Sequence, residues 1–300
     1  MSSATAAAGG SETAGPTTTL RSPYLRALRQ LRHSSLYLAL AVLAIIFLFP
    51  FYWMVSTSIK PQTQLFVVPP ILIPSPLVWD NYSRMLQFMP FFRFILNTLL
   101  ITILVLGGVM FACPLGAYSF ARLRWPGRDI AFLGVLGSMM LPSQVTLIPQ
   151  YLMFKQLGWI DTWQPLWVPA WFGSAFYIFL LRQFFMTIPR ELEDAAKIDG
   201  ASYLTIYARI MIPLVTPAIA TVAIFSFMGS WNNFVGPLIY INTPDLMPMA
   251  LALRRFQNLY SSRFDLMMCA ATVMALPPVV LFFFTQRYFI QGIALTGIKG

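Results

Sequence analysis

The chain has 300 residues, of which 58% are hydrophobic and only 10% are charged, and it contains 26 phenylalanines. A soluble domain of this length does not need so much apolar surface, so the composition indicates an integral membrane protein. The net charge of +10 is spread thinly between apolar runs. These charges form no basic patch or basic helix, so we exclude nucleic-acid binding as the main function of the chain. We expect the basic residues to orient the chain in the membrane instead.

Six windows in the chain are free of Asp, Glu, Lys and Arg and reach the roughly 20 residues that a membrane-spanning helix needs. They are Leu36–Thr57, Phe94–Ala121, Ile130–Phe154, Thr162–Leu181, Leu214–Gly236 and Leu266–Gln286. Barrel strands would show short alternating segments instead. We therefore predict an all-α, polytopic membrane protein with six transmembrane helices.

The windows divide the chain into five parts. These are a largely disordered cytoplasmic tail at 1–35, a first transmembrane helix at 36–57, an extracytoplasmic loop at 58–93, a five-helix domain at 94–287 containing a polar loop at 186–213, and a cytoplasmic tail at 288–300. The first 20 residues are small and polar, so they cannot bury enough apolar surface to become ordered, and we expect them to be dispensable for transport. The loop at 58–93 is rich in proline, which predicts an extended segment.

The distribution of Lys and Arg predicts the orientation of the chain in the membrane. If the N-terminus is cytoplasmic, thirteen of the twenty basic residues fall on the cytoplasmic side and seven on the other side. Cytoplasmic loops carry an excess of Lys and Arg, so both termini and the loop at 186–213 are predicted to be cytoplasmic.

The polar loop contains an unusual stretch, ELEDAAKIDGAS, at residues 191–202. Four of the ten carboxylates of the chain lie inside this stretch, between positions 191 and 199. We expect Thr187 to cap a first helix, with Pro189 and Glu191 in its opening turn. Gly200 is then placed to end that helix in a left-handed conformation.

A second helix is predicted to begin at Ser202 and to close at Pro213. Its apolar residues recur at helical spacing and form a stripe: Tyr203, Ile206, Tyr207 and Ile210. The alternative is a solvated surface helix that pairs with itself, Arg190 with Asp194 and Glu193 with Lys197. The apolar stripe argues against that alternative, because a solvated loop has no use for it, and a long structured loop is more often functional.

The segment from Ile188 to Pro213, IPRELEDAAKIDGASYLTIYARIMIP, resembles the EAA loop of the membrane subunits of binding-protein-dependent ABC importers. Further segments resemble carbohydrate-importer permeases of the maltose and glycerol-phosphate type: GAYSFARLRWPGR (116–128), MLPSQVTLIPQYLMF (140–154), FLLRQFF (179–185), GSWNNFVGPLIYI (229–241) and QRYFIQGIALTGIKG (286–300). The resemblance covers nearly everything after residue 35. Asp194 stands where the motif usually has Glu, and Ile212 where it usually has Leu.

The resemblance implies the type I ABC importer permease fold and a coupling role for the loop. The first helix would dock in a cleft of a partner ATPase and transmit its closure to the membrane helices through Glu191, Asp194, Ala195, Ala196, Asp199 and Gly200. It also implies three kinds of partner besides the lipid bilayer. These are a homologous second permease, two ATP-binding subunits that hold ATP and Mg²⁺, and an extracytoplasmic solute-binding protein.

The sequence contains no catalytic or metal-binding constellation. No complete phosphate-binding loop is present, since the closest segment, GIALTGIKG at 292–300, has misplaced residues and lacks the Ser or Thr. His33 is the single histidine, and Cys113 and Cys269 lie inside apolar runs. We therefore predict that the chain is not an enzyme, has no cofactor of its own, and depends on other polypeptides for ATP hydrolysis.

Polar residues inside the predicted spans are candidates for the solute path, although uncharged ones often only bridge helices. The candidates are Asn97, Gln144, Trp231, Asn232 and Asn233. Amides beside an aromatic ring suit the hydroxyls and flat apolar faces of sugars. Trp159, Trp163, Trp167 and Trp171 recur every four residues and are typical of an aromatic interface belt, with sugar stacking as the alternative.

Together these observations predict the permease subunit of an ATP-driven importer in the cytoplasmic membrane, moving a neutral mono- or oligosaccharide by alternating access. An importer for glycerol phosphate or another polyol is the first alternative, but the spans contain no cation for a phosphate. A self-sufficient secondary transporter is the second alternative. It would favour an intramembrane carboxylate for ion coupling, and the predicted spans contain none.

Overall fold

A computed structural model describes residues 23–256 and 263–296, and every regular element within those ranges is helical. The predicted all-α class is confirmed. The chain divides into two compact units, residues 1–52 and 53–300. The predicted tails at 1–35 and 288–300 lie partly outside the described residues, which exclude 1–22 and 297–300.

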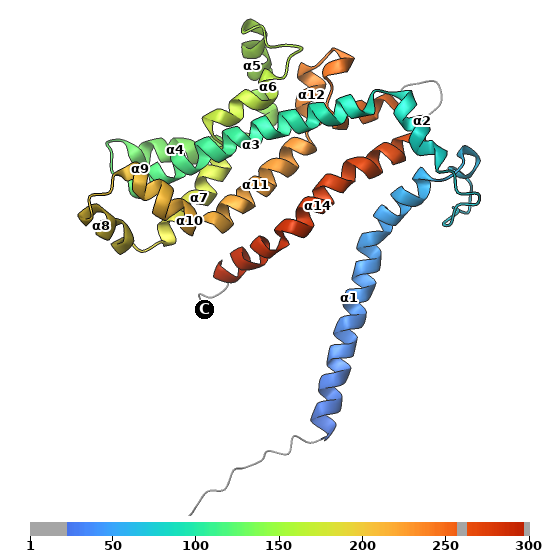
Figure 1. Ribbon diagram of the computed structural model, residues 1–300, viewed down its shortest axis with the longest axis horizontal. Helices are drawn as coiled ribbons and strands as arrows, with labels where there is room; N and C mark the ends of the chain where they lie inside the picture. The colour runs from blue at the N-terminus through green and yellow to red at the C-terminus, as the bar shows by residue number, and fades with distance from the viewer. Residues whose placement is uncertain (1–22, 257–262, 297–300) are drawn as a thin grey trace, which may run out of the picture. The chain divides into compact units, whose positions relative to one another are not determined.

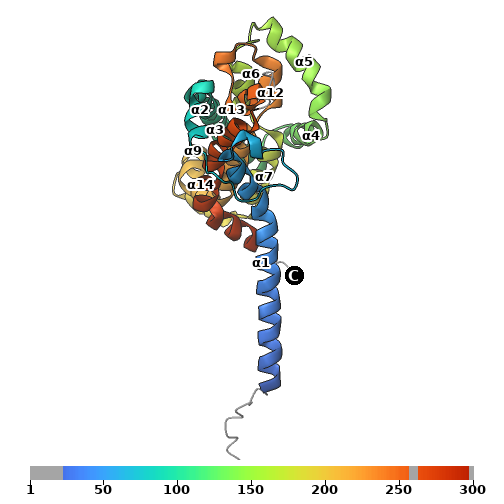
Figure 2. The same ribbon diagram turned by 90° about the vertical axis from the view of Figure 1, so that its right-hand side faces the viewer.

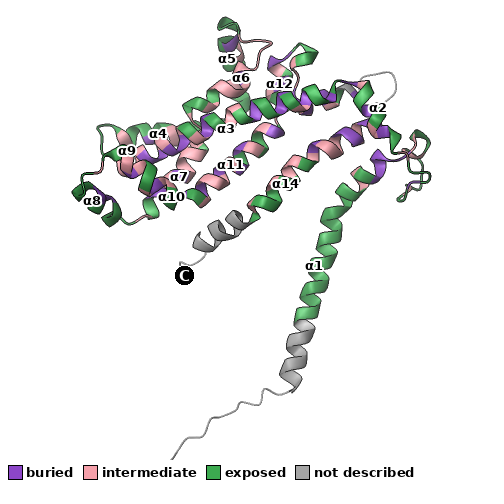
Figure 3. Ribbon diagram, in the orientation of Figure 1, coloured by how far each residue is buried: buried purple, intermediate pink, exposed green. Residues whose placement is uncertain are grey.

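The first membrane span is contained in α1, Pro23–Ser58, which starts earlier than the predicted window at 36–57. Residues His33–Ser58 are long and apolar enough to cross a membrane, with a mean hydropathy of 2.5. The large apolar side chains between Leu36 and Phe51 are exposed, as the green stretch of α1 in Figure 3 shows. Such a surface requires a nonpolar environment.

The loop at 58–93 is not extended throughout, so that prediction was wrong. It contains the short helix η1, Gln62–Gln64, and the helix α2, Asp80–Phe88. Its prolines leave residues 80–88 free to form a helix, with Asp80 in the first turn where a carboxylate is favourable. Buried Asn81 then anchors this helix by donating to the carbonyls of Ser58 and Lys60 at 3.0 and 2.9 Å.

The second unit is organised around α3, Phe91–Arg122, a single helix long enough to cross a membrane. The helices α7, Ala175–Thr187, and α11, Thr216–Trp231, pack against it, and α14, Phe264–Thr296, packs against α11 and α2. Figure 1 shows α2 at one end of α3 and α8, Glu191–Ile198, at the other. The fold thereby holds the polar loop at one end of the helix bundle.

One of the predicted spans is sharply bent in its interior. The window at 130–154 consists of α4, Arg128–Met139, and α5, Ser143–Gln156, which meet at an angle of 102°. Pro142 separates them, and proline disfavours a helical conformation at the residue before it. Figure 2 shows α5 turning away from α4. With three straight helices and three bent pairs, up to six spans are present in the described residues.

The predicted fourth span is also interrupted. It is built from α6, Gln164–Trp167, the 3₁₀ helix η2, Val168–Phe172, and α7. Pro165 and Pro169 lie in the first turns of α6 and η2, and Gly173 adopts a φ of 91° before α7 begins. These residues break the hydrogen-bond pattern that a continuous helix requires.

The remaining elements complete the two ends of the bundle. They are α9 (Tyr203–Ile206), the π-helical turn η3 (Tyr207–Met211), α10 (Ile212–Leu214), α12 (Val235–Tyr240), η4 (Pro244–Leu246), α13 (Met249–Ala252) and η5 (Leu253–Phe256). One apolar core joins α2, the start of α3, α13 and α14, and includes Phe94 and Leu266. A second core joins α3, α7 and the helices from α8 to α11, and includes Phe185 and Ile206.

Candidate functional site

The polar loop forms two helices separated by a left-handed glycine, as the sequence predicted. Gly200 has a φ of 78°. The N–H of Gly200 donates to the carbonyl of Lys197 at 3.0 Å, and that of Ala201 donates to Ala196 at 2.9 Å. These two bonds form the Schellman arrangement, which satisfies the last carbonyls of α8 and needs a residue that tolerates positive φ. Gly200 therefore sets the direction in which the chain leaves α8.

The predicted start of the second helix is confirmed, whereas the predicted start of the first helix was wrong. The hydroxyl of Ser202 accepts a hydrogen bond from the N–H of Thr205 at 3.2 Å, as an N-cap does. Thr187 instead ends α7 and donates to the carbonyl of Phe184 at 2.8 Å. The helix α8 begins four residues later, at Glu191, because Pro189 holds Ile188 in an extended conformation.

The second helix does not close at Pro213. It passes through the π-helical turn η3 into α10, which contains Pro213, and the bend comes before α11. Proline is tolerated near the start of a helical segment, where its missing N–H has no partner to lose. Tyr203–Leu214 and α11 meet at 78°, so the loop joins the bundle through a sharp bend.

One face of α8 packs on the second apolar core, and the other is exposed. Ala196 and Glu193 are buried, whereas the other residues predicted to couple are exposed: Glu191, Asp194, Ala195, Asp199 and Gly200. Large apolar side chains share this exposed surface, with Ile198 at 87% and Leu204 at 73% exposure. Exposed apolar side chains gathered in one place are typical of a surface that contacts another protein or a membrane.

The alternative in which α8 pairs with itself, Arg190 with Asp194 and Glu193 with Lys197, does not describe the structure. Lys197 pairs with Asp194 at 3.2 Å and not with Glu193. Glu193 turns inward and pairs with Arg122 at the end of α3, also at 3.2 Å. The i,i+4 pairs of that alternative do not form, because the tertiary contact offers Glu193 a buried partner that local spacing cannot supply.

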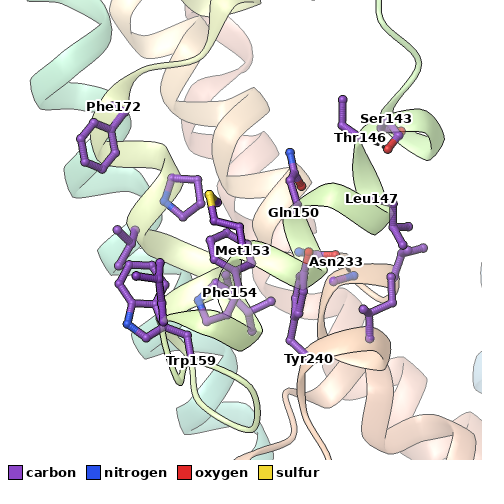
Figure 4. Close-up of a pocket in the computed structure, with 18 of the residues that line it drawn as sticks. Ser143, Thr146, Leu147, Gln150, Met153, Phe154, Trp159, Phe172, Asn233 and Tyr240 are labelled. Atoms are coloured by element: carbon purple, nitrogen blue, oxygen red, sulfur yellow. Dashed lines mark hydrogen bonds between the residues drawn. The ribbon is translucent and has the colours of Figure 1, made fainter.

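A cavity of about 790 Å³ lies between α5, α6 and α12 (Figure 4). Its polar lining consists of hydroxyls and amides: Ser143, Gln144, Thr146, Gln150 and Asn233. Aromatic rings complete it, among them Phe154, Trp159 and Tyr240. None of the lining residues that the structure describes is charged. Amide groups beside flat rings match a ligand that carries hydroxyls on an apolar frame.

A second cavity of about 400 Å³ lies between α3, α6, α7 and α11. It shares three lining residues with the first cavity: Leu166, Pro169 and Asn233. The carboxamide oxygen of Asn233 accepts from the N–H of Gly236 at 3.1 Å, which fixes the orientation of the side chain. Asn233 therefore stands at the boundary between the two cavities.

Asp161 connects the two segments that flank the larger cavity. Its carboxylate accepts from the N–H groups of Asn242 and Thr243 at 2.8 and 2.7 Å, and from the Thr243 hydroxyl at 2.6 Å. The Thr243 hydroxyl, followed by the two N–H groups, holds the pKa of the Asp161 carboxyl below its ordinary value. Asp161 also adopts a φ of 60°, and its N–H donates to Tyr240 at 2.7 Å.

A family model described as "Binding-protein-dependent transport system inner membrane component" matches residues 31–295. The chain belongs to this family. The permease is 30% identical over 281 residues to the arabinooligosaccharides transport system permease protein AraQ of Bacillus subtilis, a match that covers 90% of this chain and 100% of the relative. It is 29% identical to the sn-glycerol-3-phosphate transport system permease protein UgpE of Yersinia enterocolitica, over 83% of this chain and 91% of the relative.

The fold is shared with a solved bacterial ABC transporter involved in the import of the acidic polysaccharide alginate. The TM-score is 0.75 with 23% sequence identity, and the match covers 91% of this chain and 100% of that chain. A second structure, a bacterial alginate ABC transporter in complex with an alginate pentasaccharide-bound periplasmic protein, matches with a TM-score of 0.63 and 18% identity, over 87% of this chain and 96% of that one. At these identities the likeness concerns the fold of the permease.

The structure brings together two of the predicted solute-path residues and separates the others. Gln144 and Asn233 line the larger cavity. Asn97 is buried and donates to the carbonyls of Asp245 and Met247 at 2.8 and 3.0 Å. Trp231 lies in the first apolar core and donates to the carbonyl of Met274 at 3.1 Å, while Asn232 is exposed and donates to Met228 at 3.0 Å.

Several residues that shape these regions were not singled out from the sequence of the permease. Gln150 and Tyr240 line the cavity, yet they gave no signal because they lie in runs that resemble continuous spans. Trp159, predicted as part of an interface belt, stacks on Phe154 with 5.6 Å between ring centroids and lines the cavity. Pro142 and Pro149 lie inside the predicted span at 130–154 and could have indicated that this span bends.

Proposed function

We propose that this chain is a membrane subunit of an ATP-driven importer that moves a neutral mono- or oligosaccharide into the cytoplasm by alternating access. It pairs with a homologous permease, two subunits that bind and hydrolyse ATP with Mg²⁺, and an extracytoplasmic solute-binding protein. ATPase closure moves α8, and α8 changes the side of the membrane to which the solute path opens.

The observation that carries the choice of solute is the uncharged cavity at the junction of α5, α6 and α12. Its amides can pair with sugar hydroxyls, and its aromatic rings can stack on the apolar faces of a sugar. The relative AraQ is named for the transport of arabinooligosaccharides, which supports the same class of solute. Asn233 is the residue in best position to contact a solute that passes between the two cavities.

The exposed face of α8 supports the proposed contact with an ATPase. Asp194 and Ile198 offer charge and apolar area on a short helix whose direction is set at both ends. The distribution of Lys and Arg supports a cytoplasmic location for this loop and for both termini. Glu191, Ala195 and Asp199 lie on the same exposed side and would be contacted with Asp194.

A phosphate-bearing polyol is the second candidate solute, because the relative UgpE is named for sn-glycerol-3-phosphate. Recognition of a phosphate favours Arg or Lys at the site. The described lining of both cavities contains neither. This charge pattern favours the neutral sugar.

The test is uptake by the complete complex reconstituted in lipid vesicles with ATP inside and the loaded binding protein outside. A panel of labelled neutral sugars is compared with glycerol 3-phosphate, and we expect ATP-dependent accumulation of at least one neutral mono- or oligosaccharide. The purified permease chain alone should hydrolyse no ATP. Transport of glycerol 3-phosphate without transport of any neutral sugar would contradict the proposal.

A further inference from the structure

Arg122, the last residue of α3, lies where the ends of three helices meet. Its guanidinium donates from Nε to the carbonyl of Phe185 at 3.0 Å, and from Nη2 to the carbonyls of Phe185 and Ile188 at the end of α7. The same Nε lies 3.2 Å from Oε1 of Glu193 in the first turn of α8. One side chain thus connects α3, α7 and α8.

Both members of this ion pair are buried. Only 4% of the Arg122 side chain and 7% of the Glu193 side chain are exposed. A buried charge without a partner is strongly unfavourable, so each of these groups depends on the other. The carbonyls of Phe185 and Ile188 lie at the C-terminal end of α7, the negative end of the helix dipole, which the guanidinium neutralises.

The pair is not fully satisfied. Because Nε–H points to the carbonyl of Phe185, Oε1 of Glu193 accepts no hydrogen bond from any residue that the structure describes. A buried acceptor in this condition gains a hydrogen bond if the guanidinium shifts toward it and away from the α7 carbonyls. The arrangement therefore contains two alternative sets of bonds for one arginine.

Other ion pairs near this end of the bundle have a different character. Lys197 and Asp194 are 41% and 66% exposed and belong to the same helix. Arg128 and Asp129 are sequence neighbours, and Asp129 is 77% exposed. Such pairs contribute little to stability and do not join separate elements. The pair of Arg122 and Glu193 joins α8 directly to a membrane-crossing helix.

We propose that Arg122 and Glu193 are positioning residues that transmit the movement of α8 to α3 and α7. The proposal rests on the proposed function of the chain as an importer permease. The apolar contact of Ala196 with the second core is not directional and allows α8 to slide. The Arg122 guanidinium is fixed by its hydrogen bonds to the carbonyls at the end of α7, and the buried Glu193 cannot leave that cation without a large cost. A displacement of α8 therefore moves the ends of both membrane helices with it.

The experiment measures solute molecules transported per ATP hydrolysed, in vesicles that contain the complete complex. The variants are Glu193→Gln, which keeps the shape of the side chain, Arg122→Gln, which shortens it, and the double variant; they remove one or both charges. The matched control is Asp129→Asn, the same change from carboxylate to amide at an exposed pair on the same end of the bundle. Subunit content is determined by blotting before reconstitution.

We expect each single variant to assemble and to hydrolyse ATP in response to the loaded binding protein, while transport per ATP falls roughly tenfold. The double variant should be no worse than the poorer single variant, because both changes break the same link. Asp129→Asn should match the wild-type ratio. The ratio is chosen because a purely structural defect lowers transport and hydrolysis together and leaves their ratio unchanged.

Two results would overturn the proposal: a normal ratio in both single variants, or loss of assembled complex in Glu193→Gln and in the conservative Glu193→Asp. The second result would mean that the pair stabilises the fold and does not transmit movement. Solute import by the wild-type complex in the same vesicles reports separately on the proposed function, so the two proposals fail in distinguishable ways.

Discussion

The two ends of the helix bundle use polar residues in opposite ways. Around α8, full charges are buried and paired, as in Arg122 and Glu193, or exposed, as in Asp194. Around the cavity between α5 and α12, the polar groups are uncharged amides and hydroxyls with apolar rings beside them. A charge pair holds a fixed geometry, whereas neutral groups can bind a solute weakly enough to release it. This contrast supports the proposals that the α8 end transmits movement and that the cavity end contacts solute.

The largest effect is expected from Gly200→Val, which changes the geometry of the charged end and leaves the cavity intact. A Cβ at Gly200 meets no atom within 4 Å, so the substitution acts only through the φ of 78°. The strain amounts to about 1–2 kcal/mol and redirects the chain after α8. We expect normal abundance in the membrane but loss of both solute uptake and binding-protein-stimulated ATP hydrolysis.

The control for Gly200→Val is Gly134→Val in α4, where a Cβ also meets no atom within 4 Å but φ is not positive. This control should transport normally. Normal uptake by Gly200→Val at normal abundance would show that the direction of the chain after α8 is unimportant for transport.

The next effect is expected from Asn233→Asp, which places a carboxylate at the boundary between the two cavities. A charge in a largely apolar, uncharged site is costly and holds water that a neutral sugar must displace. We expect uptake of the sugar to fall roughly tenfold. A tenfold change corresponds to a loss of about 1.4 kcal/mol in the free energy with which the sugar binds at this site. The neighbouring change Asn232→Asp, at an exposed residue outside both cavities, is the control.

The number of solute molecules transported per ATP hydrolysed distinguishes the role of Asn233 from that of the buried pair of Arg122 and Glu193. If Asn233 serves only solute passage, its substitution lowers uptake and the stimulated hydrolysis that depends on a productive cycle, without changing docking of the ATPase. Equal losses in Asn233→Asp and Asn232→Asp, measured as initial rates of uptake, would contradict a specific role for Asn233.

A smaller effect, on stability, is expected from Asn97→Leu. The carboxamide of Asn97 donates to the carbonyls of Asp245 and Met247, and both lose their donor in the variant. Loss of a protein hydrogen bond costs about 0.5–1.5 kcal/mol. The expected result is a lower Tm of the purified complex in detergent, with a wild-type ratio of transport to hydrolysis. A control is Ser83→Ala, where an exposed hydroxyl bonds only to its own helix; an unchanged Tm for Asn97→Leu would show that these bonds are unimportant.

The smallest effect is expected from acidification, which acts on the hydrogen bonds that the Asp161 carboxylate accepts from Asn242 and Thr243. Its pKa is lowered from 3.8, so its contribution is present above the ordinary pKa and is lost only as the pH falls through the lowered value. The ratio of uptake by Asp161→Asn to uptake by the wild type should therefore stay constant between about pH 5 and pH 8. Convergence of the two rates near pH 6 would mean that Asp161 becomes protonated in that range.

The features that could be predicted from the sequence depend on a few neighbouring residues. Runs of about 20 uncharged apolar residues predict membrane helices because the bilayer sets their length. The left-handed conformation of Gly200 and the cap at Ser202 were predictable because both are decided by residues within one helical turn.

The tertiary structure alone decided which polar groups meet. Glu193 had a local partner in Lys197 by spacing, yet it pairs with Arg122, 71 positions earlier in the chain. Asn97 and Asn233 both lie in apolar runs, and only the path of the distant segments makes one a buried tie to residues 245–247 and the other a cavity residue. Residue spacing carries information about one turn of helix, whereas burial and partners follow from how remote helices pack.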